Sequence, residues 1–550
     1  MYLSLSMQSD ALRAQLEQHK SCPACGLNGS RSGHLAALFK CGLILRLVVM
    51  LAFGLFPLTA RAHIGSPNVF FEGQAGPYPV HVIVHPAEVI PGLAEISVRV
   101  EGGGVQRVTA LPISWNAGRK GAPPADVARL VRGETNLYNA QLWFMRTGAQ
   151  SVEVEVDGAS GTGRVTIPVD AVARRVLRMP RLLGGILALL GLVLVSLLVS
   201  IIGAAVRESV LEPGLEPAPK RRWWARGAMA SFALLLVLLL WGGNHWWQAE
   251  ATEYRNNRLY KPVPAVAAVH KENGHLVLRL EIPSFGGSAP LVPDHGKLMH
   301  LFLVREPSLD AFAHLHPIKL NKKTFESVLP DLPGGSYRLY ADVTYETGFS
   351  DTLTTAVEVP EKPRVEIRPL ESASVDSDDS WRIAPSFDAT HSSRECRLAG
   401  DNVMTWLAPE RIVANQPISL RFMIRAPSGQ PAVLEPYLGM SGHLALRRED
   451  GSVFTHLHPG GSASMAAMRL SVLRTEGKLP LQAAFGADEP ICQLPVETPV
   501  DQQWLRGTAA NAAGSVSFPY AFPKRGDYRL WVQVKVNGQI LTGVYDVAVD

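Results

Sequence analysis

Two segments of the chain carry the same unusual set of histidines. In each, a glycine-containing run leads into a histidine, a hairpin signal follows, and the segment closes on His-Leu-His-Pro. The segments cover residues 296–317 and 439–459. Only 16 of the 550 residues are histidines, and six of them lie in these two segments. Clustered imidazoles are typical of transition-metal sites, so the repeated spacing predicts two such sites.

Strand register brings the three histidines of the later segment together. Asp450-Gly451 is the strongest hairpin signal in the chain, and a two-residue turn centred on it pairs His443 with His458. His456 lies two residues from His458 on the same strand and therefore on the same face. We expect all three imidazoles on one side of one hairpin.

The earlier segment reaches the same arrangement with a different loop. Its connection is longer and is centred on Ser308, which pairs His300 with His316 and places His314 beside them. Cross-strand Cβ atoms lie roughly 4.5–5.5 Å apart, and residues i and i+2 about 6.5 Å apart along a strand. Imidazoles at these spacings can bind one ion at about 2 Å. Each hairpin is therefore predicted to supply three nitrogen ligands.

Several other side chains are candidate ligands. Met440 precedes His443 by three residues, and a bulge at the neighbouring glycines would turn its thioether toward the histidines. Met299 is a weaker candidate, since it is adjacent to His300 and a regular strand sends it to the opposite face. After cleavage of a signal peptide, the α-amine and imidazole of His63 would form a bidentate copper ligand. Two loop residues precede the first hairpin: Asp294 and His295.

A different interpretation of the histidines must be weighed. A single His-x-His in a strand is more often a solvated or hydrogen-bonded pair than a metal site. Duplication by itself can preserve residues that only determine the fold. The histidines would then serve hairpin packing, and the protein would be a structural or assembly protein of the cell envelope whose β-sandwich domains bind other proteins without metal.

Three apolar blocks predict export and membrane anchoring. Residues 1–62 are interpreted as an N-terminal extension with a signal peptide or signal anchor, because a basic flank and an apolar stretch precede Ala60-Arg61-Ala62. Residues 182–206 and 227–247 are predicted transmembrane helices joined by a basic cytoplasmic loop at 207–226. The expected location is the bacterial inner membrane, with most of the chain facing the periplasm.

The exported parts are predicted to be all-β. Alternating apolar and polar runs separated by turn residues indicate immunoglobulin-like or cupredoxin-like β-sandwich domains at residues 63–175, 261–360 and 400–550. The last two are internal repeats, because the same landmarks flank each histidine segment, including Gly335-Ser336-Tyr337-Arg338 and Gly526-Asp527-Tyr528-Arg529. Residues 361–399, rich in serine and aspartate, are predicted to be a flexible linker.

The cysteines agree in part with an oxidising compartment. Cys396 and Cys492 are the only two of five in the predicted exported regions, so they are a disulfide candidate. The formal net charge of +4 is small for this length, and much of the basic excess flanks the apolar blocks. Nucleic-acid binding therefore has no support.

The chain resembles bacterial exported β-sandwich proteins of the YtkA-like and CopC-like kind, which are associated with copper handling. The resemblance rests on the His63 start, on Trp143-Phe144-Met145, and on residues 299–317 and 440–459. It covers the exported domains and not the membrane hairpin. The resemblance implies a β-sandwich fold and copper as the metal.

These observations together predict a membrane-anchored periplasmic protein that acts in metal binding, delivery or homeostasis. Copper suits histidine ligands with an added thioether, and zinc is the alternative for purely nitrogen ligands. The expected partners are the membrane and other envelope or metal-transport proteins. No enzyme is expected, because the sequence contains no recognisable Ser/His/Asp constellation, phosphate loop or catalytic carboxylate pair.

Overall fold

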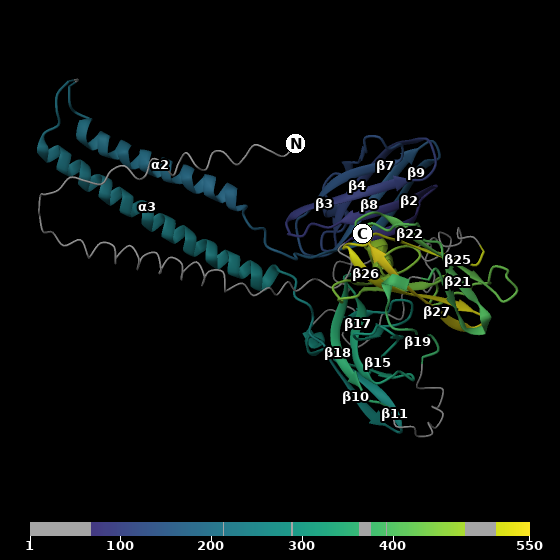
Figure 1. Ribbon diagram of the computed structural model, residues 1–550. Helices are drawn as coiled ribbons and strands as arrows, with labels where there is room; N and C mark the ends of the chain where they lie inside the picture. The colour runs from purple at the N-terminus through teal and green to yellow at the C-terminus, as the bar shows by residue number, and fades with distance from the viewer. Residues whose placement is uncertain (1–67, 213, 288–289, 362–375, 392, 479–512) are drawn as a thin grey trace, which may run out of the picture. The chain divides into compact units, whose positions relative to one another are not determined.

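The computed structural model describes residues 68–550 apart from 213, 288–289, 362–375, 392 and 479–512 (Figure 1). The predictions for residues 1–62, for His63 and for Cys492 concern residues outside this description. As predicted, the described chain consists of several antiparallel β-sheets in sandwich-like domains and one helical hairpin. Short 3-10 helices lie at Arg119–Gly121, Pro283–Gly287, Ala389–His391 and Ala399–Asp401.

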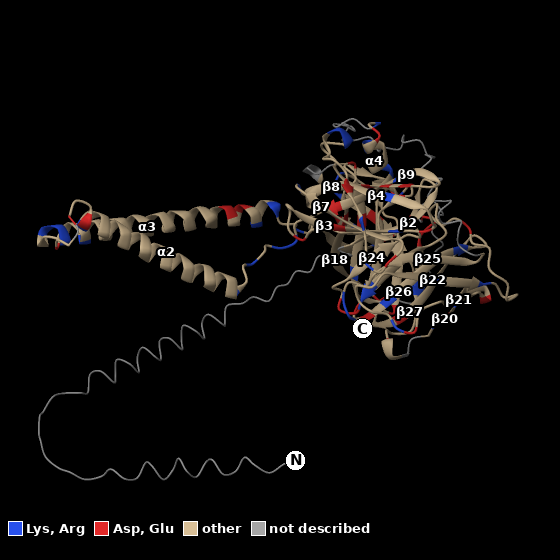
Figure 2. Ribbon diagram, turned by 90° about the horizontal axis from the view of Figure 1, so that it is seen from above, with Lys and Arg blue, Asp and Glu red and all other residues tan. Residues whose placement is uncertain are grey.

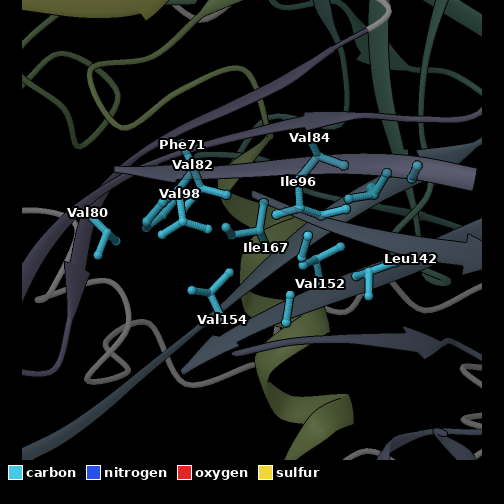
Figure 3. Packing of buried hydrophobic residues seen from close by; sticks show 14 of the residues in the cluster. Phe71, Val80, Val82, Val84, Ile96, Val98, Leu142, Val152, Val154 and Ile167 are labelled. Carbon is cyan, nitrogen blue, oxygen red and sulfur yellow. The ribbon is translucent and has the colours of Figure 1, made fainter. Parts of the chain in front are cut away.

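The first domain contains two antiparallel sheets. One has the strand order β1 (Val69–Ala75), β2 (Tyr78–His85), β3 (Gly92–Val100), β7 (Leu137–Phe144) and β6 (Arg129–Leu130). The other has the order β5 (Asp126–Val127), β4 (Val105–Ser114), β8 (Gly148–Gly158) and β9 (Gly161–Ala171). Every second residue of β2 is buried, because successive side chains of a strand point to opposite faces. Figure 3 shows its valines packed among the branched side chains of the other strands.

Two long apolar helices follow the first domain. They are α2 (Arg181–Glu208) and α3 (Pro219–Glu253), and a π-helix (Tyr254–Arg258) continues α3. Both are long and apolar enough to cross a membrane, and they contain the predicted spans 182–206 and 227–247. Figure 2 shows uncharged residues along the middle of each helix and charged residues around the connecting turn.

The helical hairpin begins and ends at the same place in the fold. The backbone N–H of Tyr260 donates to the carbonyl oxygen of Ala173 at 2.8 Å, and Ala173 and Leu259 form a parallel bridge. Ala173 precedes α2 and Tyr260 follows α3. The chain therefore returns, after both helices, to the strand end that it left.

The second domain also contains two sheets. One has the order β10 (Val266–Glu272), β11 (His275–Glu281), β16 (Thr324–Val328) and β15 (Ile318–Lys319). The other has the order β12 (Leu291–Val292), β17 (Gly335–Tyr345), β13 (His300–Arg305), β14 (Ala311–Leu315) and β19 (Ser380–Ile383). Strand β18 (Ser350–Val359) pairs with β17.

Strand β19 differs from the sequence-based expectation, because it comes from the predicted flexible linker at 361–399. Strand β19 pairs with β14, with Ile383 opposite Ala311 at one end and Ser380 opposite His314 at the other. A polar composition indicated a solvated segment, but an edge strand is held by backbone hydrogen bonds, which do not depend on apolar side chains. Part of the segment is therefore a structural element of the second domain.

The third domain repeats the second. One sheet has the order β20 (Glu395–Arg397), β21 (Val403–Trp406), β22 (Ile418–Arg425) and β25 (Ser515–Tyr520). The other has the order β24 (Phe454–Leu457), β23 (His443–Arg448), β26 (Gly526–Val536) and β27 (Gln539–Val549). This order matches β14, β13, β17 and β18 of the second domain. A helix that the sequence analysis did not predict, α4 (Met465–Thr475), follows the histidine hairpin.

The two repeats contact each other through equivalent aromatic side chains. Phe312 of β14 stacks on Trp531 of β26 at 4.8 Å between ring centroids, and Tyr340 of β17 stacks on Phe454 of β24 at 3.8 Å. Phe312 and Phe454 occupy the same position in the two repeats, as do Tyr340 and Trp531. Each repeat thus offers the same surface to the other, which is the property of an isologous interface.

Two buried arginines also join the repeats. Arg447 donates from Nε to the hydroxyl of Tyr340 at 2.8 Å and forms an ion pair with Glu306. Arg529 forms a bidentate pair with Asp546 of its own domain at 2.6 Å. Its Nη1 donates to carbonyl oxygens across the interface, those of Leu309 at 2.7 Å and Pro385 at 2.8 Å.

Candidate metal centre

Both histidine hairpins have the predicted register. Leu301 pairs with Leu315 and Phe302 with His314 in the second domain. Leu444 pairs with Leu457 and Ala445 with His456 in the third. The connection at Asp450-Gly451 is longer than the predicted two-residue turn. The hydrogen bond from Arg448 N to Val453 O closes a loop of four residues, residues 449–452. The strand register is nevertheless the predicted one.

The first histidine triad consists of His300, His314 and His316. All three side chains are buried, and one ring nitrogen of each lies within 4.8 Å of the others. His300 Nδ1 is 3.1 Å from His314 Nε2. Two nitrogens bound to one ion at about 2 Å with near-tetrahedral angles lie about 3.3 Å apart. The spacing of this pair therefore matches that of two ligands of one metal ion.

The outer nitrogens of this triad face hydrogen-bond acceptors. His300 Nε2 lies 3.2 Å from the carbonyl oxygen of Asp294, so it must carry the proton and donate. His316 Nδ1 donates to Asp379 Oδ1 at 3.0 Å. The inward nitrogens of both neutral rings, His300 Nδ1 and His316 Nε2, are then lone pairs. His316 Nε2 is buried and has no hydrogen-bond partner among the described residues.

The third ring of the triad is oriented from the other repeat. His314 Nδ1 lies 2.9 Å from Gln533 Oε1 and 3.3 Å from the hydroxyl oxygen of Tyr437, whose own proton is donated to the carbonyl of Asp378. Because both neighbours accept, the network assigns the proton of His314 to Nδ1. Nε2 of His314 is then a lone pair that faces the lone pair of His300 Nδ1.

Facing lone pairs at 3.1 Å repel each other unless a cation lies between them. A proton is a poor candidate, because burial lowers the pKa of His300 to about 4 and that of His314 well below its usual value. Burial likewise lowers the pKa of His316 far below its usual value. The first triad is therefore three neutral imidazoles with inward lone pairs, which is the donor set of a metal site.

The second triad consists of His443, His456 and His458 and repeats the geometry of the first. His443 Nδ1 is 3.1 Å from His456 Nε2, and His443 Nε2 lies 3.1 Å from the carbonyl oxygen of Tyr437. Tyr437 thus has the same role as Asp294 in the first repeat. Burial lowers the pKa of all three rings, that of His458 to about 3.

The second triad differs from the first in the residue that orients its middle ring. His456 Nδ1 lies 3.4 Å from Asp342 Oδ2, and Asp342 also accepts a hydrogen bond from the Thr352 hydroxyl at 2.6 Å. Burial raises the pKa of Asp342 to about 7. Protonation of this carboxyl allows the ring protons of the second triad to rearrange without a metal. Gln533 has no titratable proton, so this protonation route is absent from the first triad.

The two triads complete each other. Gln533 pairs with His443 across β23 and β26, and Asp342 pairs with His300 across β13 and β17, so the two occupy equivalent positions. Each nevertheless contacts the middle histidine of the opposite triad. The triads are also adjacent, since the His456 ring centroid lies 5.6 Å from that of His300 and 5.7 Å from that of His314. The sites therefore require both repeats.

Replacement of Gln533 by leucine is expected to weaken metal binding in the first triad, although Gln533 belongs to the third domain. The variant keeps the side-chain volume and removes the acceptor that orients His314. Loss of such an outer contact typically costs 10- to 100-fold in metal affinity. The metal affinity of the first triad is measured by chelator competition. The matched control is Thr352→Val, which removes a hydroxyl beside the second triad instead. Equal affinities in wild type and Gln533→Leu would contradict the proposed orientation.

The remaining candidate ligands lie elsewhere or outside the description. Met299 is fully buried in the apolar core of the second domain, among Leu301 and Leu303. Met440 packs with the apolar core of the first domain. Cys396 lies on β20, and its predicted partner Cys492 is outside the described residues, as is His63. The structure thus shows packing roles for both methionines.

Sequence reasoning missed the residues that orient the histidines. They are Asp342, Asp379, Tyr437 and Gln533. A signal for two of them was present, because alignment of the landmarks at Gly335 and Gly526 places Asp342 and Gln533 at the same repeat position. Asp379 lay in the predicted linker.

A cavity with a mixed polar and apolar lining adjoins the triads. Its volume is about 160 Å³, and its lining includes His300, His456 and His458. Carboxyl groups of the first and second domains also line it, among them Asp170 and Asp342. Burial raises the pKa of Asp170 to about 8. The cavity thus places several carboxyl groups next to the buried histidines.

Comparison with known proteins gives one family match. Residues 398–550 match a family described as a domain of unknown function (DUF8832), and they coincide closely with the third domain. No curated protein matches the chain. The match covers less than half of the chain and assigns no activity.

Three of the solved structures that match the chain are distant likenesses. An engineered protein is 21% identical with a TM-score of 0.15, over 18% of this chain and 21% of that one. The BSP domain of a biofilm-associated protein is 7% identical with a TM-score of 0.13, over 91% of this chain and 69% of that one. The D1–D4 ectodomain fragment of ICAM-5 is 9% identical with a TM-score of 0.14, over 86% and 77%. The chain thus spans about a fifth of the length of the engineered protein. TM-scores of 0.13–0.15 support no inference about function.

Proposed function

We propose that this protein is a membrane-anchored, periplasm-facing protein that binds copper at the two histidine triads. The observation that carries the proposal is the pair of facing lone pairs on His300 and His314, 3.1 Å apart and fully buried. Hydrogen bonds alone leave that contact unsatisfied. The three histidines of the first triad offer ring nitrogens within 4.8 Å of one another, which favours metal binding over a packing role.

Copper(I) suits this donor set better than zinc does. Each triad offers three neutral nitrogens and no carboxylate, so a buried ion keeps its full charge. The cost of burying an ion rises steeply with its charge, which favours a monovalent ion. Zinc remains the alternative metal.

The contacts around the helical hairpin support a placement of all three β-domains on one side of the membrane. Ala173 and Tyr260 are hydrogen-bonded, so the parts of the chain before α2 and after α3 must lie on one side of any membrane that the helices cross. An N-terminal export signal would place that side in the periplasm. The domains would then be immunoglobulin-like or cupredoxin-like sandwiches that pass copper to or from other envelope or metal-transport proteins.

Titration of the purified full-length protein in detergent with Cu⁺ tests the proposal. Under anaerobic, reducing conditions we expect two Cu⁺ ions per chain with dissociation constants of about nanomolar or tighter, measured by competition with a coloured chelator. Replacement of the exposed His270 by alanine is the control and should change neither value. Micromolar or weaker binding of both Cu⁺ and Zn²⁺ would favour the structural or assembly role instead.

A further inference from the structure

A third group of potential ligands lies between the two triads. It consists of Asp294, His295 and His458, each of which offers one atom within 4.8 Å of the others. The ring centroid of His295 is 5.3 Å from that of His458 and 5.4 Å from that of His443. One oxygen of Asp294 accepts from the backbone N–H of Ala466 at 2.8 Å at the start of α4, which leaves the other oxygen facing His295.

The candidate ligand nitrogens of this group are buried. His295 Nε2 has no hydrogen-bond partner among the described residues, and the ring of His458 interacts with the backbone of Ala463 without a hydrogen bond of ordinary geometry. A buried polar atom without a partner destabilises the folded state, so such atoms call for a bound ion or water. An imidazole ring has two nitrogens, so His458 can offer one to the second triad and the other to a further ion.

The backbone turn does not explain His295. Residues 294–297 form a tight turn in which His295 has φ 52°, and the equivalent Leu438 has φ 49° in the turn 437–440. Leucine therefore supports the same conformation in the sister repeat. The Asp294-His295 pair is particular to the first repeat, and its chemistry is the remaining reason for its presence.

The cavity beside the triads also adjoins two members of this group. Asp294 and His458 both line it, together with His300 and His456. A hydrated ion in the cavity would meet the Asp294 carboxylate and the His458 ring beside the deeper nitrogens of the triads. The carboxylate also distinguishes the group electrostatically, because neither triad contains a negative charge.

We propose that Asp294, His295 and His458 form a third site, for a divalent ion of the Zn²⁺ class. The ligands are one carboxylate oxygen of Asp294, Nε2 of His295 and one ring nitrogen of His458, whose other nitrogen binds the ion of the second triad. When both ions are bound, His458 is a bridging imidazolate, and its ring proton is released to solvent. This inference rests on the proposed function because His458 is shared with the second triad.

The test is Zn²⁺ binding by full-length protein already loaded with Cu⁺. We expect one more Zn²⁺ per chain in the wild type than in His295→Leu, counted by elemental analysis after gel filtration. His295→Leu takes the residue of the equivalent turn and should fold. Asp294→Asn keeps the acceptor for Ala466 N and should also lose the ion or bind it at least tenfold more weakly.

The outcomes separate this inference from the proposed function. Two Cu⁺ ions in every variant, with equal Zn²⁺ counts in wild type and His295→Leu, would refute the third site and leave the triads intact. Failure of the wild type to bind Cu⁺ would refute the proposed function. The difference between variants also cancels any Zn²⁺ bound elsewhere on the chain, and His270→Ala should match the wild type.

Discussion

Replacement of His314 by alanine is expected to lower the Cu⁺ affinity of the first triad by roughly a thousandfold. Metal binding by a site of three or four ligands is worth about 10–16 kcal/mol, so each ligand carries about 4 kcal/mol. His314 supplies a buried inward nitrogen 3.1 Å from that of His300. Chelator competition on the full-length protein would show one tight Cu⁺ site and one weak one.

The control for this variant addresses packing. His314 stacks on Phe302 at 4.3 Å between ring centroids, so alanine also leaves a cavity. His314→Gln retains a polar side chain of similar length and should weaken Cu⁺ binding comparably while disturbing the core less. If His314→Gln bound two Cu⁺ ions as tightly as the wild type, the first triad would not be a metal site.

Replacement of Arg529 by alanine is expected to lower the free energy of unfolding by about 3–5 kcal/mol. The Arg529 side chain is 3% exposed and that of Asp546 is 11% exposed, so the variant leaves a largely buried carboxylate without its cation. It also removes the donors to the carbonyl oxygens of Leu309 and Pro385 in the other repeat. Chemical denaturation followed by tryptophan fluorescence measures the change.

An exposed ion pair of the same residue types provides the control. Arg411 and Asp550 form a pair at 2.6 Å whose side chains are 72% and 56% exposed. Arg411→Ala should cost less than about 1 kcal/mol. Because Arg529 joins the repeats, its loss should also weaken both triads for Cu⁺. Loss of stability with unchanged Cu⁺ affinity would show that the triads do not depend on the interface.

Local periodicity was sufficient to predict the geometry within each hairpin. The turn signals at Ser308 and at Asp450-Gly451 set the strand register, and register alone places three histidines on one face. The same reasoning identified the two apolar helices, because length and composition determine such segments. The structure agrees with the predicted register in both hairpins.

Contacts between domains were beyond that reasoning. Gln533 is 219 residues from His314, and no periodicity links them. Strand β19 pairs through its backbone, which composition does not reveal. Helix α4 had a local signal that was overlooked, because Ser464 caps its first turn by accepting from Ala467 N and good helix formers follow. Interfaces depend on the matching of surfaces, which a strand pattern does not encode.

The equivalent stacking pairs at the interface of the repeats bear on the origin of the protein. Phe312 on Trp531 and Phe454 on Tyr340 are the contacts that two copies of one ancestral domain would make as a symmetric dimer. Fusion of the copies into one chain turns dimerisation into an intramolecular step at a local concentration of about millimolar. It also frees the copies to diverge, as at Asp342 and Gln533. The two triads of the one chain can therefore differ in strength.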